Sequence, residues 1–129
     1  MANFVYDHIH LRSSDPEATA AFYQKMFNAE ILRSMQGGIP RLDMKVGGAN
    51  VFIAAVVADG KTAAPPMSPY QGLDHFGLAV TGLDAVVAEL KAKGAMFTME
   101  PTAIRPGVRI AFLRGPENVS IELLERSDS

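Results

Sequence analysis

The stretch YDHIHL at residues 6–11 returns as LDHFGL at residues 73–78. The chain has three histidines, and two of them, His8 and His75, stand at the same point of this repeated phrase. When these histidines are superposed, HIHLRSSDPEATAAFY at 8–23 aligns with HFGLAVTGLDAVVAEL at 75–90. Self-similarity of this kind indicates that each copy is one supersecondary unit. The repeat therefore predicts two copies of one structural module.

The first copy begins with a strand and a helix. Residues 4–12 are rich in β-branched, aromatic and other apolar side chains, which favours a strand. Ser14 or Asp15 before Pro16 is a helix start signal, so we expect a helix over residues 16–28. Four of its side chains recur at three- and four-residue steps and are expected to form its buried stripe: Ala18, Ala21, Phe22 and Met26.

The second copy repeats this order. We expect a strand over residues 73–80 and a helix over residues 83–93, which Gly94 ends in the position typical of a C-terminal glycine. Each helix is followed by three short apolar stretches that turn residues separate. These predicted strands are 30–35, 41–46 and 50–57 in the first copy and 96–100, 108–113 and 119–125 in the second. Each module is therefore expected to be βαβββ.

The two modules are expected to share one domain of the α+β class. Residues 59–72, DGKTAAPPMSPYQG, are rich in proline and small residues and predict a linker. It separates a first module at about 4–58 from a second at about 73–126. Because a module of about 55 residues buries too little surface to be stable alone, we expect residues 1–129 to form a single domain in which the modules pair.

The composition excludes several classes of function. The net charge is -2 and the Lys and Arg residues are scattered, so the chain offers no basic face for nucleic acid. No apolar run reaches the roughly 18 residues of a membrane span, and the first residues lack the pattern of a signal peptide, so we expect a cytoplasmic protein. Without cysteine, the chemistry must come from His, carboxylate, Ser, Tyr or Arg side chains.

The last predicted strand of each module carries a second match. ANVFIAAV at 49–56 aligns with ENVSIELL at 117–124, which places Ala54 on Glu122. The spacing agrees, since Ala54 follows His8 by 46 residues and Glu122 follows His75 by 47. The equivalent positions 8, 54, 75 and 122 thus carry His, Ala, His and Glu. Three of these four side chains can bind a metal.

Two imidazoles and one carboxylate make a set that suits divalent Fe, Mn, Zn, Co or Ni and leaves coordination positions open for water and substrate. Histidines in strands are more often structural or surface residues, and His8 and His75 could be remnants of a duplication that bond only to backbone. The repeat favours the metal site, because paired modules would bring their first and last strands around one centre. We expect one divalent metal ion, bound by His8, His75 and Glu122.

From Tyr6 to Arg126 the chain resembles the vicinal oxygen chelate superfamily, which includes glyoxalase I, methylmalonyl-CoA epimerase, fosfomycin-resistance proteins, bleomycin-binding proteins and extradiol dioxygenases. The resemblance rests on HIHLRSSD at 8–15 with AFY at 21–23, on DHFGLAV at 74–80 and on SIELLE at 120–125. It implies paired βαβββ modules whose curved sheets form an open cup around a divalent metal, with His8, His75 and Glu122 in ligand positions.

The resemblance also has a departure. Glyoxalase I has a carboxylate ligand where this chain has Ala54, and a methyl group cannot bind a metal. The implied site therefore has three ligands, which looks more like the extradiol dioxygenases and the fosfomycin-resistance enzymes.

Four further residues are candidates for catalysis or substrate binding: His10, Arg12, Arg105 and Arg109. His10 and Arg12 share the strand face of His8, whereas Glu125 is expected to face away from Glu122. Imidazole exchanges protons near neutrality, so His10 fits a general acid or base, or a hydrogen-bonding partner of the metal ligands. In glyoxalase I the arginine at the place of Arg12 binds the glutathione carboxylate, so the resemblance implies that Arg12 holds an anionic substrate group; the alternative is a solvated arginine beside a carboxylate.

Arg105 and Arg109 flank the Pro106-Gly107 turn near the expected mouth of the cup. They could bind an acidic substrate, although a solvated role is the favoured interpretation.

Three functions fit these residues. The preferred one is glyoxalase-like isomerase or lyase chemistry on a small, oxygen-rich, anionic molecule, in which the metal stabilises an enediolate and Glu122 or His10 is the base. The second is an Fe(II)-dependent extradiol dioxygenase, but the tyrosine and histidine usual in such enzymes are replaced by Phe112 and Val56-Val57, and those enzymes have two more modules. The third, a metal-free small-molecule binding or resistance protein, would not be expected to keep three ligands.

Two-module members of the superfamily that this chain resembles commonly dimerise, so we expect a homodimer.

Overall fold

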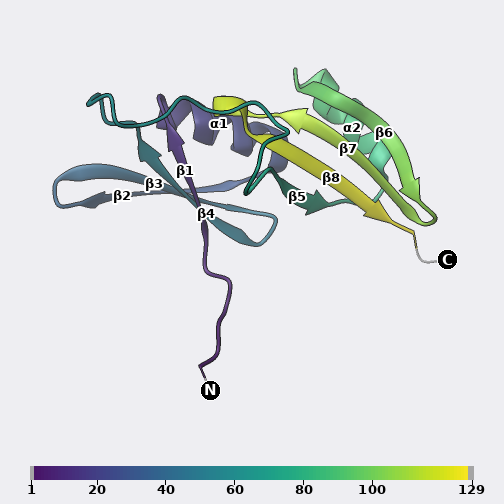
Figure 1. The fold of residues 1–129 in the computed structure, drawn as a ribbon, viewed down its shortest axis with the longest axis horizontal. Helices are drawn as coiled ribbons and strands as arrows, with labels where there is room; N and C mark the ends of the chain where they lie inside the picture. Colours follow the sequence, from purple (N-terminus) through teal and green to yellow (C-terminus); the bar gives the residue numbers. More distant parts are fainter. Residues whose placement is uncertain (1, 128–129) are drawn as a thin grey trace. The chain divides into compact units, whose positions relative to one another are not determined.

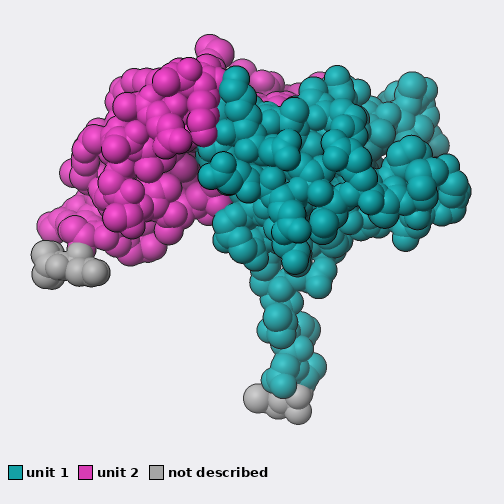
Figure 2. Space-filling view, turned by 180° about the vertical axis from the view of Figure 1, so that it is seen from behind, with its two compact units in different colours: residues 1–63 teal, residues 64–129 magenta. Residues whose placement is uncertain are grey.

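The computed structural model describes residues 2–127 (Figure 1). The chain divides into two compact units, residues 1–63 and residues 64–129 (Figure 2). The boundary lies inside segment 59–72, which the sequence suggested as a linker. That the two units form a single domain stays a prediction.

The first unit is a four-stranded sheet with one helix. Its elements are β1 (Ile9–Ser13), α1 (Pro16–Phe27), β2 (Glu30–Gln36), β3 (Ile39–Val46) and β4 (Ala49–Ala55). The strand order is β1-β4-β3-β2, with β1 and β4 parallel and the other neighbours antiparallel.

The second unit repeats this topology. Its elements are β5 (Phe76–Ala79), α2 (Leu83–Ala92), β6 (Met96–Arg105), β7 (Val108–Arg114), the short 3₁₀ helix η1 (Pro116–Asn118) and β8 (Ser120–Arg126). The order is β5-β8-β7-β6, again with only the first pair parallel. The predicted α+β class with two βαβββ modules is therefore confirmed. No helix within residues 2–127 is long and apolar enough to cross a membrane.

The helix α1 starts as predicted but buries a different stripe. Asp15 is its N-cap, and the Asp15 carboxylate accepts a hydrogen bond from the Ala18 amide at 3.1 Å. The buried side chains are Thr19, Ala20, Tyr23 and Met26. The predicted stripe is therefore wrong except for Met26, since Ala18 and Ala21 are exposed and Phe22 is half-buried. Thr19 on the buried face forms a 2.7 Å hydrogen bond with the Ser13 hydroxyl, and a polar pair gives no hydrophobic signal.

The strand predicted over residues 4–12 begins only at Ile9. Ile9 lies opposite Val51, and β4 starts at Ala49, so residues before Asp7 have no β4 partner left. Phe4, Val5 and Tyr6 are accordingly 94%, 89% and 63% exposed. In Figure 1 this N-terminal segment runs away from the sheet of its own unit.

Each unit has its own small core between the helix and one face of the sheet. In the first unit Met44, Val46, Val51 and Ile53 are buried on the α1 side. In the second unit the core consists of Leu83, Val87, Leu90, Leu113, Ile121 and Leu123. Strand residues alternate between faces, so the residues between these positions lie on the opposite side. We call that side of each sheet its helix-free face.

Candidate functional site

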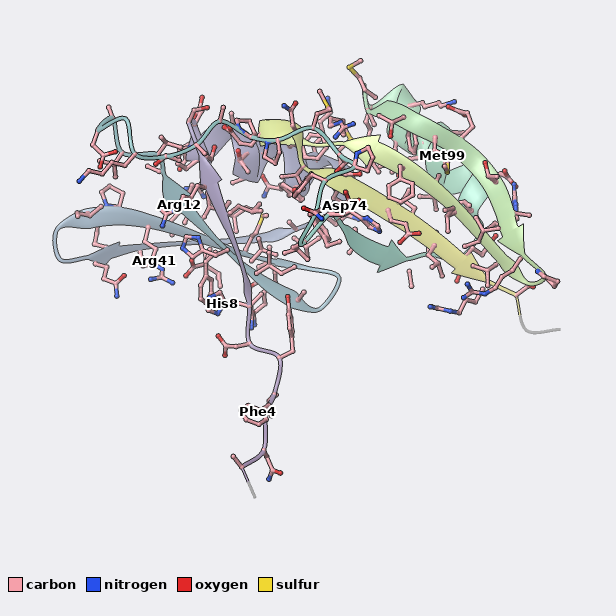
Figure 3. The ribbon with its side chains drawn as sticks, viewed as in Figure 1. Phe4, His8, Arg12, Arg41, Asp74 and Met99 are labelled. Carbon is pink, nitrogen blue, oxygen red and sulfur yellow. The ribbon has the colours of Figure 1, made fainter. Side chains whose placement is uncertain are left out.

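The helix-free face of the first unit carries the predicted residues around β1. His8, His10 and Arg12 alternate with the inward-facing Ile9, Leu11 and Ser13. The rings of His8 and His10 lie 6.4 Å apart, centroid to centroid, so the two imidazoles are on one side of the chain. Figure 3 shows His8 just before β1 and Arg12 farther along it.

His8 is held by two neighbours. Its Nδ1 lies 2.6 Å from the carboxylate of Asp7, and its ring stacks on Phe52 with 4.1 Å between centroids. A neutral imidazole that donates its Nδ1–H to a carboxylate keeps the Nε2 lone pair available for a metal. The environment of His8 therefore fits a ligand that binds through Nε2.

The strand register changes which residue of the first unit corresponds to Glu122. His10 lies opposite Phe52, and Gly77 lies opposite Glu122. Since His10 and Gly77 each follow the repeated histidine by two residues, Phe52 takes the place of Glu122, and Ala54 lies one pair farther along, opposite Arg12. The alignment of Ala54 with Glu122 is therefore wrong by two residues. A shift of two leaves every side chain on its own face, so the alternation of the sequence could not reveal it.

The second unit brings His75 and Glu122 together. The Nε2 of His75 lies 3.3 Å from Oε1 of Glu122, and its Nδ1 lies 2.8 Å from Oδ2 of Asp74. The ring of Phe112 meets the His75 ring edge to face at 4.9 Å. The imidazole is thus flanked by two carboxylates, and the Asp–His contact is the same one that His8 makes with Asp7.

The spacing of these donors fits a metal site. Two ligand atoms at about 2.0–2.2 Å from one ion, at tetrahedral or octahedral angles, lie about 2.8–3.6 Å apart. The 3.3 Å between Nε2 and Oε1 is in this range. Both atoms are electron-rich, so together they attract a cation, such as a metal ion or a proton. His75 and Glu122 are therefore suited to be two ligands of one divalent ion.

A complete three-ligand site needs donors from both units. Over residues 2–127, no three His, Asp or Glu side chains gather into a metal site. The third predicted ligand, His8, belongs to the first unit and His75 and Glu122 to the second. The set of His8, His75 and Glu122 therefore stays a prediction.

Asp74 is anchored by the segment before it. Its Oδ1 accepts a hydrogen bond from the Tyr70 amide at 3.1 Å, and its backbone carbonyl accepts one from the Ser68 hydroxyl at 3.1 Å. The hydrogen bond with His75, followed by that from Tyr70, holds the pKa of Asp74 below its usual value of 3.8. The carboxylate beside His75 is therefore kept ionised and in one place.

Arg41, which the sequence did not single out, shares the helix-free face of the first unit. Its guanidinium binds Asp43 at 3.1 Å and the Gln36 side chain at 2.8 Å, and it lies 4.8 Å above the Phe52 ring. Strand alternation places residues 41 and 43 on this face and would have been enough to find them. Arg12, by contrast, makes no ion pair with any residue from 2 to 127, so its charge is available to an anion.

Arg105 and Arg109 lie away from His75 and Glu122 in the second unit. Arg109 is on the face covered by α2, where it forms a two-pronged ion pair with Asp84 at 2.7 and 3.0 Å. Arg105 is exposed at the end of β6. Both line an open hollow of about 430 Å³ at the β6–β7 turn, which contains neither His75 nor Glu122. The structure thus favours the solvated interpretation of Arg109.

The chain is similar to a known family and to known proteins. The family model of the glyoxalase/bleomycin resistance protein/dioxygenase superfamily matches residues 5–123. A probable chloroplastic lactoylglutathione lyase of Arabidopsis thaliana is 29% identical over 128 residues, which cover 92% of this chain and 35% of that protein. A putative lactoylglutathione lyase of Brassica oleracea var. gemmifera is 26% identical over 123 residues, covering 92% and 43%. The chain therefore spans less than half the length of these relatives.

Solved structures show the same fold. A glyoxylase/bleomycin resistance protein/dioxygenase domain from Frankia sp. EAN1pec superposes with a TM-score of 0.75 at 21% identity, covering 98% of this chain and 100% of that one. The fosfomycin resistance protein FosX from Listeria monocytogenes gives 0.74 at 21% identity, covering 99% and 97%. With the family model matched over nearly the whole chain, the chain belongs to the glyoxalase/bleomycin resistance protein/dioxygenase superfamily.

Proposed function

We propose that the protein is a divalent-metal-dependent lyase or isomerase that acts on a small, oxygen-rich, anionic molecule. The observation that carries this proposal is the convergence of His75 Nε2 and Glu122 Oε1 to 3.3 Å on the helix-free face of the second unit. The lactoylglutathione lyases among its relatives support the reaction class, although they are longer proteins of 26–29% identity.

His8, His75 and Glu122 would hold the metal, which is Fe, Mn, Zn, Ni or Co in divalent form. When bound, such an ion supplies Lewis-acid polarisation of a substrate oxygen. The phenyl ring of Phe52 at the place equivalent to Glu122 offers no fourth protein ligand. Coordination positions therefore remain for adjacent oxygens of the substrate.

Side chains on the helix-free faces of the two units would transfer the substrate proton and bind the charged group of the substrate. A base removes the proton from a hydroxyl-bearing carbon next to a carbonyl, so that the C–H electron pair forms a carbon–carbon double bond and the carbonyl π pair moves onto its oxygen. The proton then returns to the former carbonyl carbon, while the hydroxyl proton of the first carbon passes to the second oxygen and leaves a carbonyl group on the first carbon. His10 and Glu122 are the two candidates for this base. Arg12, which has no ion-pair partner among residues 2–127, would bind the anionic group of the substrate.

A second candidate function is an Fe(II)-dependent extradiol dioxygenase. The feature that favours it is the ligand set itself, because two histidines and one carboxylate with open positions are typical of non-haem Fe(II) oxygenases. The side chain that meets His75 edge to face is Phe112, which has no hydroxyl to exchange a proton. We therefore place this function second.

Elemental analysis of protein purified without added metal tests the metal-dependent proposal. We expect about one divalent ion per chain in the wild type and a loss of bound metal in His8→Ala and Glu122→Ala. Wild-type protein that stays metal-free when offered Fe, Mn, Ni, Co and Zn would contradict the proposal.

The two chemistries differ in their need for oxygen. Anaerobic proton exchange of 2-oxo compounds in D₂O measures lyase or isomerase chemistry, and O₂ uptake with a panel of catechols measures dioxygenation. Turnover without oxygen would exclude the dioxygenase, and oxygen uptake that depends on a catechol would exclude the lyase. Comparison of His10→Gln with Glu122→Gln, both loaded with metal, then identifies the base.

We also propose that the protein is a homodimer, as two-module members of this superfamily commonly are. The exposed apolar side chains of Phe4, Val5 and Tyr6 support an association between chains. Sedimentation equilibrium of the full chain tests this proposal, because a monomeric mass at micromolar concentration contradicts it.

A further inference from the structure

Asp74 is the centre of a small network in the segment just before β5. Its carboxylate faces Nδ1 of His75 with one oxygen, at 2.8 Å, and accepts the Tyr70 amide with the other, at 3.1 Å. Its backbone carbonyl accepts the hydroxyl of Ser68 at 3.1 Å. Both carboxylate oxygens are therefore engaged, and the backbone of Asp74 is fixed as well.

The first unit contains the same Asp–His pair without this support. Asp7 lies 2.6 Å from Nδ1 of His8, but its side chain is 80% exposed, compared with 32% for Asp74. Its backbone carbonyl accepts a hydrogen bond from the Asn50 side chain, and among residues 2–127 no amide holds its carboxylate as Tyr70 holds that of Asp74. The repeat thus has one firmly held aspartate and one loosely held aspartate.

We propose that Asp74 is a positioning residue, which Ser68 and Tyr70 hold in place and which fixes His75 in the tautomer with the proton on Nδ1 and the lone pair on Nε2. The metal-binding consequence of this inference rests on the proposed function, whereas the tautomer does not. We call Ser68, Tyr70 and Asp74 the linker clamp.

The geometry on the other side of the ring explains why the tautomer matters. Glu122 lies 3.3 Å from Nε2 and can accept a hydrogen bond from a protonated Nε2. Without Asp74, an Nε2–H that donates to Glu122 becomes the favoured form of the neutral ring, because it is the remaining hydrogen bond to a carboxylate. That form has its lone pair on Nδ1, turned away from Glu122. The linker clamp therefore keeps the ligand atom of His75 beside the carboxylate ligand.

The tautomer can be measured without any metal. In long-range ¹H–¹⁵N correlation spectra of metal-free full chain, recorded where the imidazole signals no longer change with rising pH, we expect the Nδ1–H form of His75 in the wild type and the Nε2–H form in Asp74→Ala. Asp74→Asn keeps one acceptor oxygen, which cannot serve both His75 and Tyr70 fully, so a mixture of the two forms is expected. An Nε2–H form in the wild type, or identical spectra in the wild type and Asp74→Ala, would overturn the inference.

The affinity for Co(II) supplies the second measurement. We expect the dissociation constant to rise about 10–100-fold in Asp74→Ala, as is common for groups that orient metal-bound histidines, less in Asp74→Asn, and least in Asp7→Ala. The visible spectrum of bound Co(II) should change in Asp74→Ala but not in Asp59→Asn, which removes one exposed negative charge elsewhere in segment 59–72. Far-UV circular dichroism confirms that each variant is folded.

The His75 tautomer and the Co(II) affinity together distinguish a failure of the proposed function from a failure of the role of Asp74. Wild-type protein that binds no Co(II) removes the proposed function, while the nitrogen spectra still decide whether Asp74 sets the tautomer. Wild-type binding with an unchanged affinity and spectrum in Asp74→Ala keeps the proposed function and overturns the role of the linker clamp.

Discussion

Gly77 takes in the second unit the place that His10 takes in the first, because each follows the repeated histidine by two residues and lies on the helix-free face. A Cβ atom at position 77 would lie 3.2 Å from Oε1 of Glu122, closer than an ordinary van der Waals contact. The missing side chain thus gives the Glu122 carboxylate the space in which it meets His75. One module uses this position for a candidate base, and the other leaves it empty for a candidate ligand.

Gly77→Ala should therefore weaken metal binding without unfolding the protein. Gly77 is not among the residues with positive φ, so alanine fits the backbone. The carboxylate of Glu122 can move away from the new methyl group, which takes it out of its position beside His75. We expect a loss of metal affinity of roughly tenfold, measured by chelator competition with Zn(II). Thermal unfolding of the metal-free variant is the control, since a less flexible unfolded chain leaves its stability unchanged or raises it by about 0.4–1 kcal/mol.

At the scale of the elements, the start of α2 depends on a residue of β8. The N-cap residue is Gly82, which has no side chain to accept the first amides of the helix. Glu125 supplies the missing acceptor, because its carboxylate accepts hydrogen bonds from the amides of Gly82 and Leu83. This agrees with the expectation that Glu125 faces away from Glu122, and it gives Glu125 a structural role.

Glu125→Ala should lower the free energy of unfolding by about 0.5–2 kcal/mol, the range for loss of a helix cap. Metal affinity should not change, because Glu125 lies on the face covered by α2. Glu122→Ala is the matched variant on the same strand, and it should show the opposite pattern: metal binding lost with a smaller effect on metal-free stability. Urea unfolding and chelator competition measure the two quantities. Equal losses of metal affinity in both variants would contradict the assignment.

A second contact ties α2 to the sheet and should depend on pH. The hydrogen bonds from Arg109 hold the pKa of Asp84 below its usual value of 3.8. Since the pKa is lower in the folded state, the pair stabilises the fold above the unfolded pKa, and this stabilisation is lost as the pH falls through the folded pKa. We expect the wild type to melt at a higher temperature than Asp84→Asn at pH 7 and the difference to shrink as the pH falls below 3.8, measured as Tm against pH. Asp59→Asn, which removes a carboxylate that has no arginine partner among residues 2–127, should show no such convergence.

The sequence predicted the existence of the helices and strands more accurately than the way in which they pack. Within residues 2–127 each predicted strand and helix is present, although β6 runs five residues past its expected end at residue 100, and Gly94, with φ 96°, follows α2 as expected. Besides the alignment of Ala54 with Glu122, the two clear errors are the buried stripe of α1 and the start of β1. The first involves the buried hydrogen bond between Ser13 and Thr19, and the second depends on where β4 starts. Local hydrophobic periodicity contains neither a polar pair nor a strand partner distant in the sequence.

At the scale of the whole molecule, most of the candidate site was predicted from the internal repeat. It singled out His8, His75 and Glu122 as candidate ligands, although the alignment that paired Glu122 with Ala54 was shifted by two residues. It could not find Phe52, Gly77 or the linker clamp, because their roles follow from register and from hydrogen bonds outside the repeat. Duplication therefore points to candidate ligand positions in a sequence, while the residues that contact those candidates differ between the copies.

The proposed ligand set draws on both units, and the stability of the full chain offers a test of this. A metal that binds only the folded state raises the free energy of unfolding by about 2.7 kcal/mol at a hundred times its dissociation constant. If His8, His75 and Glu122 bind one ion, His8→Ala should lose most of this gain, as Glu122→Ala does, although the two residues are in different units. His10→Ala is the matched control and should keep most of it, because His10 is not in the ligand set. Thermal unfolding with and without Zn(II) measures the gain, and a His8→Ala variant with the full wild-type gain would confine the metal ligands to the second unit.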